Sequence, residues 1–305
     1  MAEKNKNTRI GILLAAGYGT RLRPLTLVKP KPLVPLFGIP LLEIAIRQMS
    51  SAGFSLIAVN GGWLGEQIAA YLSLRQDAFP GTKFRYFDEP KVLGVAGGMR
   101  RMLKELPAGD VLIQNADILH SIDLNAIMNG HENSKAFATL VGAGSPLAMQ
   151  VDADRVCGLG KTVDSTHGFS GIHVLSENCR QKLYDWEKSA IVPFYNELIA
   201  AGSPIRADVF DSGYLWQDIG HLQYYHSVHC ELWENSEFLN LASNLELDLY
   251  WDPDSKVSMS PSSNINGQVG NSIIWPGVSW SGNCRDSLIL QDVCGKGTLN
   301  KEIVL

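Results

Sequence analysis

A glycine-bearing loop near the N-terminus carries the clearest chemical signal in the sequence. The run Leu14-Ala15-Ala16-Gly17-Tyr18-Gly19-Thr20-Arg21 continues through prolines to Lys31. Small residues let a backbone approach a ligand closely, and the amides of such a loop can donate to phosphate oxygens. Arg21 adds a planar fork of donors that suits pyrophosphate, and Lys31 adds a compact charge that suits an α-phosphate. A structural turn is the alternative, whereas a dinucleotide loop would need a glycine where Leu22 stands.

The charge distribution also predicts an anionic ligand. The net charge is −5, which argues against nucleic-acid and anionic-membrane partners because these surfaces require a basic face. The segment from Lys4 to Leu42 nevertheless contains no Asp or Glu, and its cations are Lys4, Lys6, Arg9, Arg21, Arg23, Lys29 and Lys31. A solvated tail explains Lys4 and Lys6. It does not explain the later cations, which alternate with Leu, Pro and Gly.

Alternating apolar segments must position these residues. Predicted strands cover Ile10–Leu14, Leu56–Asn60, Phe84–Phe87 and Val111–Asn115, and predicted helices cover Leu41–Ser50, Leu64–Leu72 and Gly97–Leu106. This order predicts an α/β fold with a mostly parallel sheet covered by helices on both faces. In such sheets ligands gather at the carboxyl ends of the strands. Both the glycine loop and Asn115-Ala116-Asp117 follow predicted strands, so we expect them to meet at that edge.

The second half of the chain changes character twice. Short strands are predicted from Ala136 to Val174, followed by helices over Ser189–Ala201 and His221–Glu234. In the tail, Val257 to Leu290, a loose hexad spacing of apolar residues predicts a few turns of a β-helix. We therefore expect a catalytic domain over residues 9–236 and a β-rich extension over 237–305. The extension is too short to stand alone and favours packing on the main domain or self-association.

The complete motif resembles a known family. The pattern L-A-A-G-x-G-T-R-L-x-P-L-T, followed by P-K-P-L-V-P, is similar to the signature of the nucleotidyltransferase family of sugar-nucleotide pyrophosphorylases. Later blocks follow in the same order: Val59-Asn60 with Leu64-Gly65-Glu66-Gln67-Ile68, Leu93-Gly94-Val95-Ala96-Gly97-Gly98, Asn115-Ala116-Asp117, Phe169-Ser170-Gly171-Ile172-His173-Val174 and Trp216-Gln217-Asp218-Ile219-Gly220. The resemblance runs from Ile10 to about Tyr225. It is strongest to mannose-1-phosphate guanylyltransferase-like and N-acetylmuramate-1-phosphate uridylyltransferase-like members.

The resemblance implies both a fold and a reaction. The expected fold is a Rossmann-like, GT-A-like domain with a tail like the left-handed β-helix of some relatives. The expected reaction joins a nucleoside triphosphate to a sugar 1-phosphate and releases pyrophosphate, with Mg²⁺ held by Asp117 and Asp218. Arg21 and Lys31 are the other expected catalytic residues. Expected nucleotide contacts are Leu14, Ala15, Ala16, Gly17, Gly19, Thr20, Arg21, Lys31, Gly94, Gly97 and Asn115, and expected sugar contacts are Asn60, Trp63, Lys161 and Gly171.

Several alternatives remain open at this level. Many relatives carry a Glu-Lys-Pro block that meets the sugar phosphate; this chain lacks it, and Lys161 is the candidate replacement. Base and sugar stay undetermined, so uridylyl or thymidylyl transfer to N-acetylmuramate 1-phosphate or glucose 1-phosphate is an alternative to guanylyl transfer. A non-catalytic homologue that binds nucleotide sugars is another alternative. A hexapeptide-repeat acyltransferase is disfavoured because the repeats are too few.

The remaining composition limits other classes of function. The five cysteines form no CxxC pair, which predicts reduced thiols, and a zinc site near His226 and Cys230 is disfavoured because it lacks the usual ligand pattern. No run reaches transmembrane length, and Ile10 to Ala16 is too short for a secretory signal. We therefore expect a cytoplasmic protein with no membrane or nucleic-acid partner.

Overall fold

The computed structural model describes residues 8–160 and 167–305. Contacts between Cα atoms divide the chain into two compact units. The first contains the described residues of Met1–Gly17 and Ala45–Asp218, and the second contains Tyr18–Ile44 and Ile219–Leu305. The chain therefore passes from the first unit to the second within the glycine-bearing loop. The expected domain boundary at residue 236 stays a prediction.

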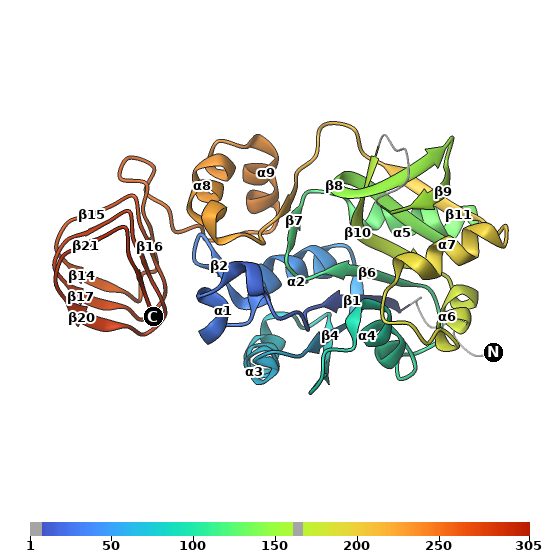
Figure 1. The fold of residues 1–305 in the computed structure, drawn as a ribbon, viewed down its shortest axis with the longest axis horizontal. Helices are drawn as coiled ribbons and strands as arrows, with labels where there is room; N and C mark the ends of the chain where they lie inside the picture. Colours follow the sequence, from blue (N-terminus) through green and yellow to red (C-terminus); the bar gives the residue numbers. More distant parts are fainter. Residues whose placement is uncertain (1–7, 161–166) are drawn as a thin grey trace. The chain divides into compact units, whose positions relative to one another are not determined.

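An eight-stranded sheet forms the centre of the first unit (Figure 1). Its strands lie in the order β11-β9-β8-β10-β6-β1-β4-β5. β1 is parallel to β4 and β6, and β4 is parallel to β5, whereas β10 is antiparallel to β6 and β8. The predicted α/β class with a parallel-rich sheet is confirmed. The strands are β1 (Arg9–Leu14), β4 (Phe54–Gly61), β5 (Lys83–Asp88), β6 (Val111–Asn115), β8 (Ala138–Asp152), β9 (Arg155–Leu159), β10 (His167–Leu175) and β11 (Ile205–Val209).

The parallel strands are apolar because helices cover them. In β1 the four residues between Arg9 and Leu14 are buried, which is typical of a parallel strand with both faces covered. Met99 and Met102 of α4 belong to the same hydrophobic core as Ile10 and Ile12 of β1. The helices of the first unit are α3 (Gly65–Arg75), α4 (Gly94–Leu103), α5 (Leu124–Ser134), α6 (Glu177–Tyr184) and α7 (Val192–Ala200), and α2 (Leu41–Ser51) begins in the second unit and ends in the first.

Side-chain caps explain where two of these helices begin. The Asp123 carboxylate accepts hydrogen bonds from the backbone N–H groups of Asn125 and Ala126 at the start of α5. The Ser176 hydroxyl accepts from Cys179 N–H at the start of α6. Such caps satisfy backbone donors that the first helical turn leaves without partners.

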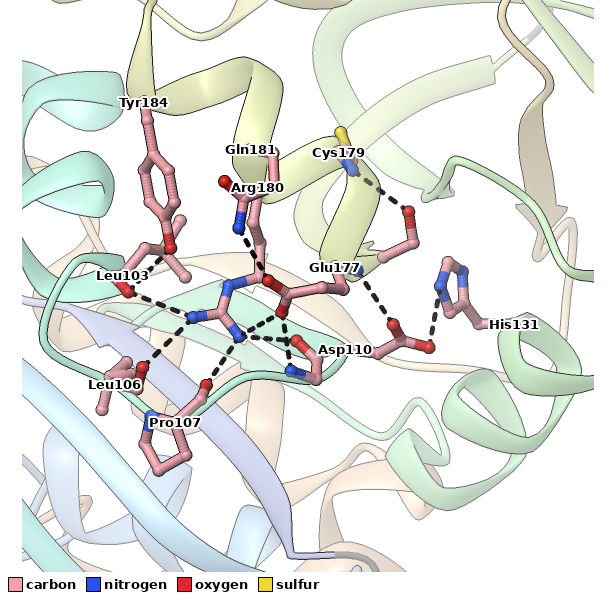
Figure 2. A network of polar contacts seen from close by, with 12 residues as sticks. Leu103, Leu106, Pro107, Asp110, His131, Glu177, Cys179, Arg180, Gln181 and Tyr184 are labelled. Atoms are coloured by element: carbon pink, nitrogen blue, oxygen red, sulfur yellow. Dashed lines mark hydrogen bonds and ion pairs between the residues drawn. The ribbon is translucent and has the colours of Figure 1, made fainter.

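A buried arginine closes the carboxyl end of α4 (Figure 2). Arg180, on α6, is 1% exposed and forms an ion pair with Glu177 at 3.2 Å. Its guanidinium group donates to the carbonyl oxygens of Leu103 at 3.1 Å, Leu106 at 3.4 Å, Pro107 at 2.8 Å and Gly109 at 2.6 Å. The Tyr184 hydroxyl also donates to Leu103 O, at 3.0 Å. A cation here satisfies free carbonyl groups and complements the helix dipole.

Two sequence predictions for the first unit were wrong in detail. Short strands were expected from residue 136 onward, but β8 is a single strand of 15 residues. It continues through Gly144-Ser145-Pro146 because β9 and β10 pair with it and register shifts absorb the irregularity. Helix α4 begins at Gly94, earlier than the predicted Gly97, because the Glu89 carboxylate accepts a hydrogen bond from Leu93 N–H at 3.2 Å.

The second unit has its own aromatic core. The Phe37 ring lies 4.7 Å from the His229 ring, 5.2 Å from Phe238 and 5.7 Å from Trp251, measured between centroids. His229 also accepts a hydrogen bond from Phe37 N–H at 3.2 Å. These contacts pack the segment 18–44 against the later helices. The elements are α1 (Leu25–Val28), β2 (Pro35–Leu36), β3 (Ile39–Pro40), α8 (Leu222–Trp233) and α9 (Ser236–Asn244), of which α8 alone was predicted.

The C-terminal strands form three small parallel sheets with a common repeat (Figure 1). Paired residues are 15 positions apart, as in the contact of Asn271 with Asp286. The expected hexad spacing was therefore wrong, because one turn of the repeat takes 15 residues. The strands are β13 (Ser258–Met259), β14 (Asn264–Asn266), β15 (Val269–Gly270), β16 (Ile273–Ile274), β17 (Ser279–Ser281), β18 (Cys284–Arg285), β19 (Leu288–Ile289), β20 (Cys294–Lys296), β21 (Leu299–Asn300) and β22 (Ile303–Val304).

The helices were compared with the length and apolar character of a membrane span. In residues 8–160 and 167–305, none of them combines the length and apolar character that crossing a bilayer requires.

Candidate functional site

The two predicted metal-binding aspartates lie on neighbouring parts of one β-ribbon. Strand β7 (Ile118–His120) pairs antiparallel with β12 (Trp216–Asp218), and Asp218 is directly opposite Ile118. Asp117 is the residue before Ile118, so it lies within one residue of Asp218 across the ribbon. Cross-strand neighbours have backbones about 5 Å apart. The backbones of two aspartates that are distant in sequence are thus brought close together.

The glycine-bearing loop begins beside this ribbon. Leu14, the last residue of β1, pairs with Asn115 in the parallel register of β1 and β6. Ala116 N–H then donates to Leu14 O at 3.0 Å, which ties the turn that carries Asp117 to the end of β1. Ala15, Ala16 and Gly17 follow directly. The start of the predicted phosphate loop and the predicted metal ligands therefore share the carboxyl edge of the sheet.

A buried amide holds the first loop residue. The Asn60 side chain, at the end of β4, accepts from Ala15 N–H at 2.7 Å and donates to Glu89 Oε1 at 2.8 Å. Asn60 is only 4% exposed. These contacts engage one acceptor position and one N–H of the amide inside the protein, and the predicted contact of Asn60 with a sugar stays a prediction.

Three glycines of the predicted site occupy crowded positions. A Cβ on Gly94 would lie 2.8 Å from Ser189 Cβ, and φ there is +75°. A Cβ on Gly97 would lie 2.9 Å from Leu93 Cβ. A Cβ on Gly171, where φ is +85°, would lie 2.9 Å from Asn115 Nδ2, so this glycine lies against the strand that leads to Asp117. Only residues without side chains fit at these positions.

The remaining loop residues belong to the second unit and contact one another there. A Cβ on Gly19, where φ is +61°, would lie 3.2 Å from Lys31 Cβ, so the buried Lys31 packs beside the loop. Thr20 begins the short helical turn that also contains Arg21. Arg21 Nη1 lies 2.7 Å from His221 Nε2. Since Arg can only donate, His221 accepts through that nitrogen.

Trp63 and Lys161 complete the predicted set. Trp63 follows the end of β4 and is 36% exposed. A Cβ on the preceding Gly62 would lie 2.7 Å from Ala16 O, so the segment that carries Trp63 runs close to the loop. Lys161 lies outside the described residues.

A polar pocket of about 400 Å³ lies within the first unit, beside strand β12. His167 and Asp211 line it, with Nε2 and Oδ1 separated by 3.2 Å. A Cβ on Gly144 would lie 3.9 Å from Tyr214 Oη and 4.0 Å from Trp216 Cε3, which connects the pocket with the strand that ends at Asp218. The other lining residues are Ala143, Ser145, Pro146, Ala148, Gly168 and Phe210.

A buried histidine supports the turn that carries Asp117. Ile122 N–H donates to His120 Nδ1 at 3.2 Å, so the proton lies on Nε2, which donates to Gln114 Oε1 at 3.1 Å. The Gln48 amide donates to His120 O at 2.6 Å. Burial lowers the pKa of His120 to about 4, so the ring is neutral at pH 7. Sequence reasoning missed both His120 and Glu89, because neither stands in a pattern that reveals its partners.

The described residues were searched for groups of side chains that could hold a metal ion. Among them, no group of three or more His, Cys, Asp or Glu side chains has the geometry to hold a metal ion. His229, which precedes Cys230 in the sequence, contacts Phe37 N–H and Tyr225 O. A pair of carboxylates with substrate phosphates is the composition that Mg²⁺ sites commonly have.

This arrangement is typical of α/β proteins that bind ligands at the carboxyl edge of a parallel sheet. Residues 10–148 match the family described as nucleotidyl transferase. The match covers slightly less than half of the chain, and it supports the resemblance to sugar-nucleotide pyrophosphorylases. The matched range contains the glycine-bearing loop, Gly94, Gly97 and Asp117, whereas Gly171 and Asp218 lie beyond it.

Curated relatives share parts of the chain. A mannose-1-phosphate guanylyltransferase from Mycobacterium tuberculosis is 27% identical over 219 residues, which cover 68% of this chain and 60% of that protein. An N-acetylmuramate alpha-1-phosphate uridylyltransferase from Neisseria meningitidis serogroup B is 39% identical over 116 residues, which cover 38% of this chain and 49% of that protein. The chain thus spans about half the length of the curated relatives that it matches.

A solved structure shares the fold. The crystal structure of a candidate glucose-1-phosphate thymidylyltransferase from Bacillus anthracis superposes with a TM-score of 0.65 and 18% identity. The match covers 75% of this chain and 99% of that chain. At this level of identity, the comparison supports the architecture alone.

Proposed function

We propose that this chain is a sugar-1-phosphate nucleotidyltransferase, which joins a nucleoside triphosphate to a sugar 1-phosphate and releases pyrophosphate. The observation that carries the proposal is the approach of the Asp117 and Asp218 backbones, at the β7–β12 ribbon beside the glycine-bearing end of β1. Two carboxylates next to phosphate-binding backbone suit a reaction between polyanions. The family match over residues 10–148 and the names of both curated relatives support the same class of reaction.

Asp117 and Asp218 are the residues that would hold Mg²⁺. Their oxygen ligands fit a hard cation that keeps several positions for water and substrate phosphates. When bound, the ion supplies positive charge at the reacting phosphate and helps to orient it.

The chain's own residues supply binding and orientation. We assign the backbone amides of Ala16 and Gly17 to phosphate oxygens, and Arg21 and Lys31 to the charge of the triphosphate and the departing pyrophosphate. Ala15 N–H is already held by the Asn60 side chain. An oxygen of the sugar phosphate attacks the α-phosphorus as the bond to pyrophosphate breaks. This oxygen is already ionised, so the reaction needs no general base from the protein.

The polar pocket beside β12 is our candidate for the sugar. Its small residues leave room for a ring, and His167, Asp211 and Tyr214 offer polar groups for hydroxyls. We expect Asp211→Asn to raise KM for the sugar 1-phosphate about tenfold and to leave KM for the triphosphate unchanged. Equal changes in both constants would argue against this assignment.

Mannose 1-phosphate and GTP are the first substrate pair to test. The relative matched over the larger share of this chain, 68%, is named for that pair. UTP with N-acetylmuramate 1-phosphate is the alternative, because the second relative is named for it and has the higher identity, 39%. A panel that also includes thymidine triphosphate and glucose 1-phosphate, with pyrophosphate release as the readout, separates these possibilities.

Removal of single carboxylates tests the site itself. We expect Asp117→Asn and Asp218→Asn to lower kcat about a hundredfold or more with the fold retained, and Arg21→Ala to impair pyrophosphate departure and weaken triphosphate binding. Chelation of divalent ions should abolish turnover, and added Mg²⁺ should restore it. Asp123→Asn is the matched control, because it removes a nearby carboxylate while Asn still caps α5. Full activity in either test variant would remove that aspartate from the metal site.

A non-catalytic nucleotide-sugar-binding role is the other outcome. It would follow if no pair in the panel released pyrophosphate while calorimetry still showed nucleotide-sugar binding. We also propose that the C-terminal parallel strands form a β-helix extension of the Rossmann-like, GT-A-like domain, based on their 15-residue repeat. The handedness of this repeat, self-association through it and the cytoplasmic location stay predictions.

A further inference from the structure

We propose that Glu89 is a positioning residue for triphosphate binding, acting through Asn60 on the backbone of the glycine-bearing loop. This inference rests on the proposed function of the loop as the phosphate-binding element. Glu89 itself need not touch the substrate. Its role is to fix the direction in which the N–H group of Ala15 is held and the point at which α4 begins.

Both oxygens of the Glu89 carboxylate are used inside the protein. Glu89 follows β5 and is 2% exposed. Oε1 accepts from Asn60 Nδ2 at 2.8 Å, and Oε2 accepts from Leu93 N–H at 3.2 Å. Its own N–H donates to Gly61 O at 2.6 Å. One side chain therefore joins the end of β4 to the first turn of α4.

The chemistry of the donors fixes the orientation of the Asn60 amide. Ala15 N–H can only donate, so the amide must turn its oxygen toward Ala15, at 2.7 Å. The NH₂ group then faces Glu89, whose carboxylate can only accept. Without this acceptor the amide could reverse and point its NH₂ group at Ala15 N–H. Two donors would then oppose each other, and the loop would lose its anchor.

The hydrogen-bonded set Glu89, Asn60 and Ala15, which we call the relay, is tightly packed. A Cβ on Gly98 of α4 would lie 2.5 Å from Glu89 Oε1 and 2.9 Å from Asn60 Nδ2. A Cβ on Gly62 would lie 2.7 Å from Ala16 O. The loop, the end of β4 and α4 thus approach one another at distances that only glycine permits. A shift of Asn60 would be transmitted to the loop, because its amide is hydrogen-bonded to Ala15 N–H and the neighbouring backbones leave no space for a side chain.

Two substitutions grade the loss of the relay. Glu89→Ala removes both acceptors, and we expect KM for the triphosphate to rise about tenfold while KM for the sugar 1-phosphate stays within twofold. Glu89→Gln keeps one acceptor for Asn60 but places an NH₂ group toward Leu93 N–H, and we expect a rise of about threefold. In an Asn60→Ala background the effect of Glu89→Ala on KM should largely disappear, because the relay is already broken.

Arg180→Met provides the control for a purely structural effect. It removes the buried charge of Arg180, which contacts the carboxyl end of α4, whereas Glu89 contacts the first turn of α4 beside the loop. We expect it to lower the denaturation midpoint at least as much as Glu89→Ala without changing KM for the triphosphate. Equal changes of KM in the two variants would overturn the proposal and leave Glu89 a structural residue.

Direct binding separates this inference from the proposed reaction. If the wild-type protein releases no pyrophosphate with any pair, the reaction is wrong, and calorimetric titration of the same variants with each triphosphate and Mg²⁺ becomes the readout. Weaker triphosphate binding by Glu89→Ala, with binding retained by Arg180→Met, would still support the relay. The relay is overturned if the wild-type protein binds no triphosphate, or if both variants bind as the wild type does.

Discussion

The two ends of helix α4 are held by buried ions of opposite sign. At the first turn, the Glu89 carboxylate accepts from Leu93 N–H, and at the last turn the Arg180 guanidinium donates to Leu103 O and Leu106 O (Figure 2). Each charge has the sign that complements the helix dipole at its end. The local physics is therefore the same at both ends.

The two ends differ in where their contacts lead. Arg180 contacts backbone carbonyl groups and Glu177, so its network closes on structural elements. Glu89 contacts Asn60, which holds Ala15 of the proposed phosphate loop. The comparison teaches that a buried charge acquires a functional consequence only through its partners. Both ends should contribute to stability, but only the Glu89 end should influence substrate affinity.

The largest expected effect on stability concerns the Arg180 end of α4, which we call the structural end. Arg180→Met leaves several buried carbonyl groups without a donor, and we expect it to lower the free energy of unfolding by about 3–5 kcal/mol. Urea denaturation followed by circular dichroism measures this change. The kinetic constants of the folded fraction should remain those of the wild type. A rise in KM for the triphosphate would show that the two ends of α4 are not functionally separate.

Acid should weaken the support of the turn that carries Asp117, which lies outside α4. The pKa of His120 is lowered by burial to about 4, below the ordinary value of 6.5, so between these values the unfolded chain binds a proton that the native state excludes. This contribution to stability is complete above pH 6.5 and is lost as the pH falls toward 4, by about 3 kcal/mol.

Urea unfolding at pH 7 and pH 4.5 tests this dependence in the wild type and in His120→Asn. The variant should lose part of the pH dependence, because one of the buried histidines is gone. His173, whose pKa burial lowers to about 3, should retain its own contribution in both proteins. An identical pH dependence in the two proteins would contradict the assignment to His120.

A smaller effect is expected when a methyl group is forced into the relay. Gly98→Ala would place Cβ 2.5 Å from Glu89 Oε1, and we expect a loss of about 2 kcal/mol in unfolding free energy with a several-fold rise in KM for the triphosphate. Gly81→Ala, where a Cβ would meet nothing within 4 Å, is the control and should leave KM unchanged. An unchanged KM for Gly98→Ala would weaken the link between packing and binding.

The smallest expected effect on stability concerns Tyr184, at the structural end of α4. Tyr184→Phe removes one hydroxyl that donates to Leu103 O at 3.0 Å, while Arg180 continues to satisfy the same oxygen. We expect a loss of about 1 kcal/mol in the free energy of unfolding and no kinetic change. A loss as large as that of Arg180→Met would mean that the hydroxyl, rather than the guanidinium group, is the main partner.

Local patterns account for much of the fold. The apolar run that became β6 was predicted with its observed bounds, Val111–Asn115, and the helix predicted from Leu41 to Ser50 ends one residue later, at Ser51. These elements follow from hydrophobic periodicity and end signals, which are properties of neighbouring residues. Irregular pairing was harder to predict. The length of β8 depends on partner strands that are distant in sequence, and the 15-residue repeat of the tail depends on which strands stack.

The candidate site divides in the same way. The residue types of the loop, from Leu14 to Lys31, and the placement of Asp117 after a strand were determined by the sequence alone, because close approach to phosphate and strand-end position are local properties. The proximity of Asp117 to Asp218 was decided by the pairing of β7 with β12. The engagement of Asn60 by Glu89 was decided by the meeting of β4, β5 and α4. Hydrogen bonds between distant residues depend on side-chain positions that only the packed chain defines.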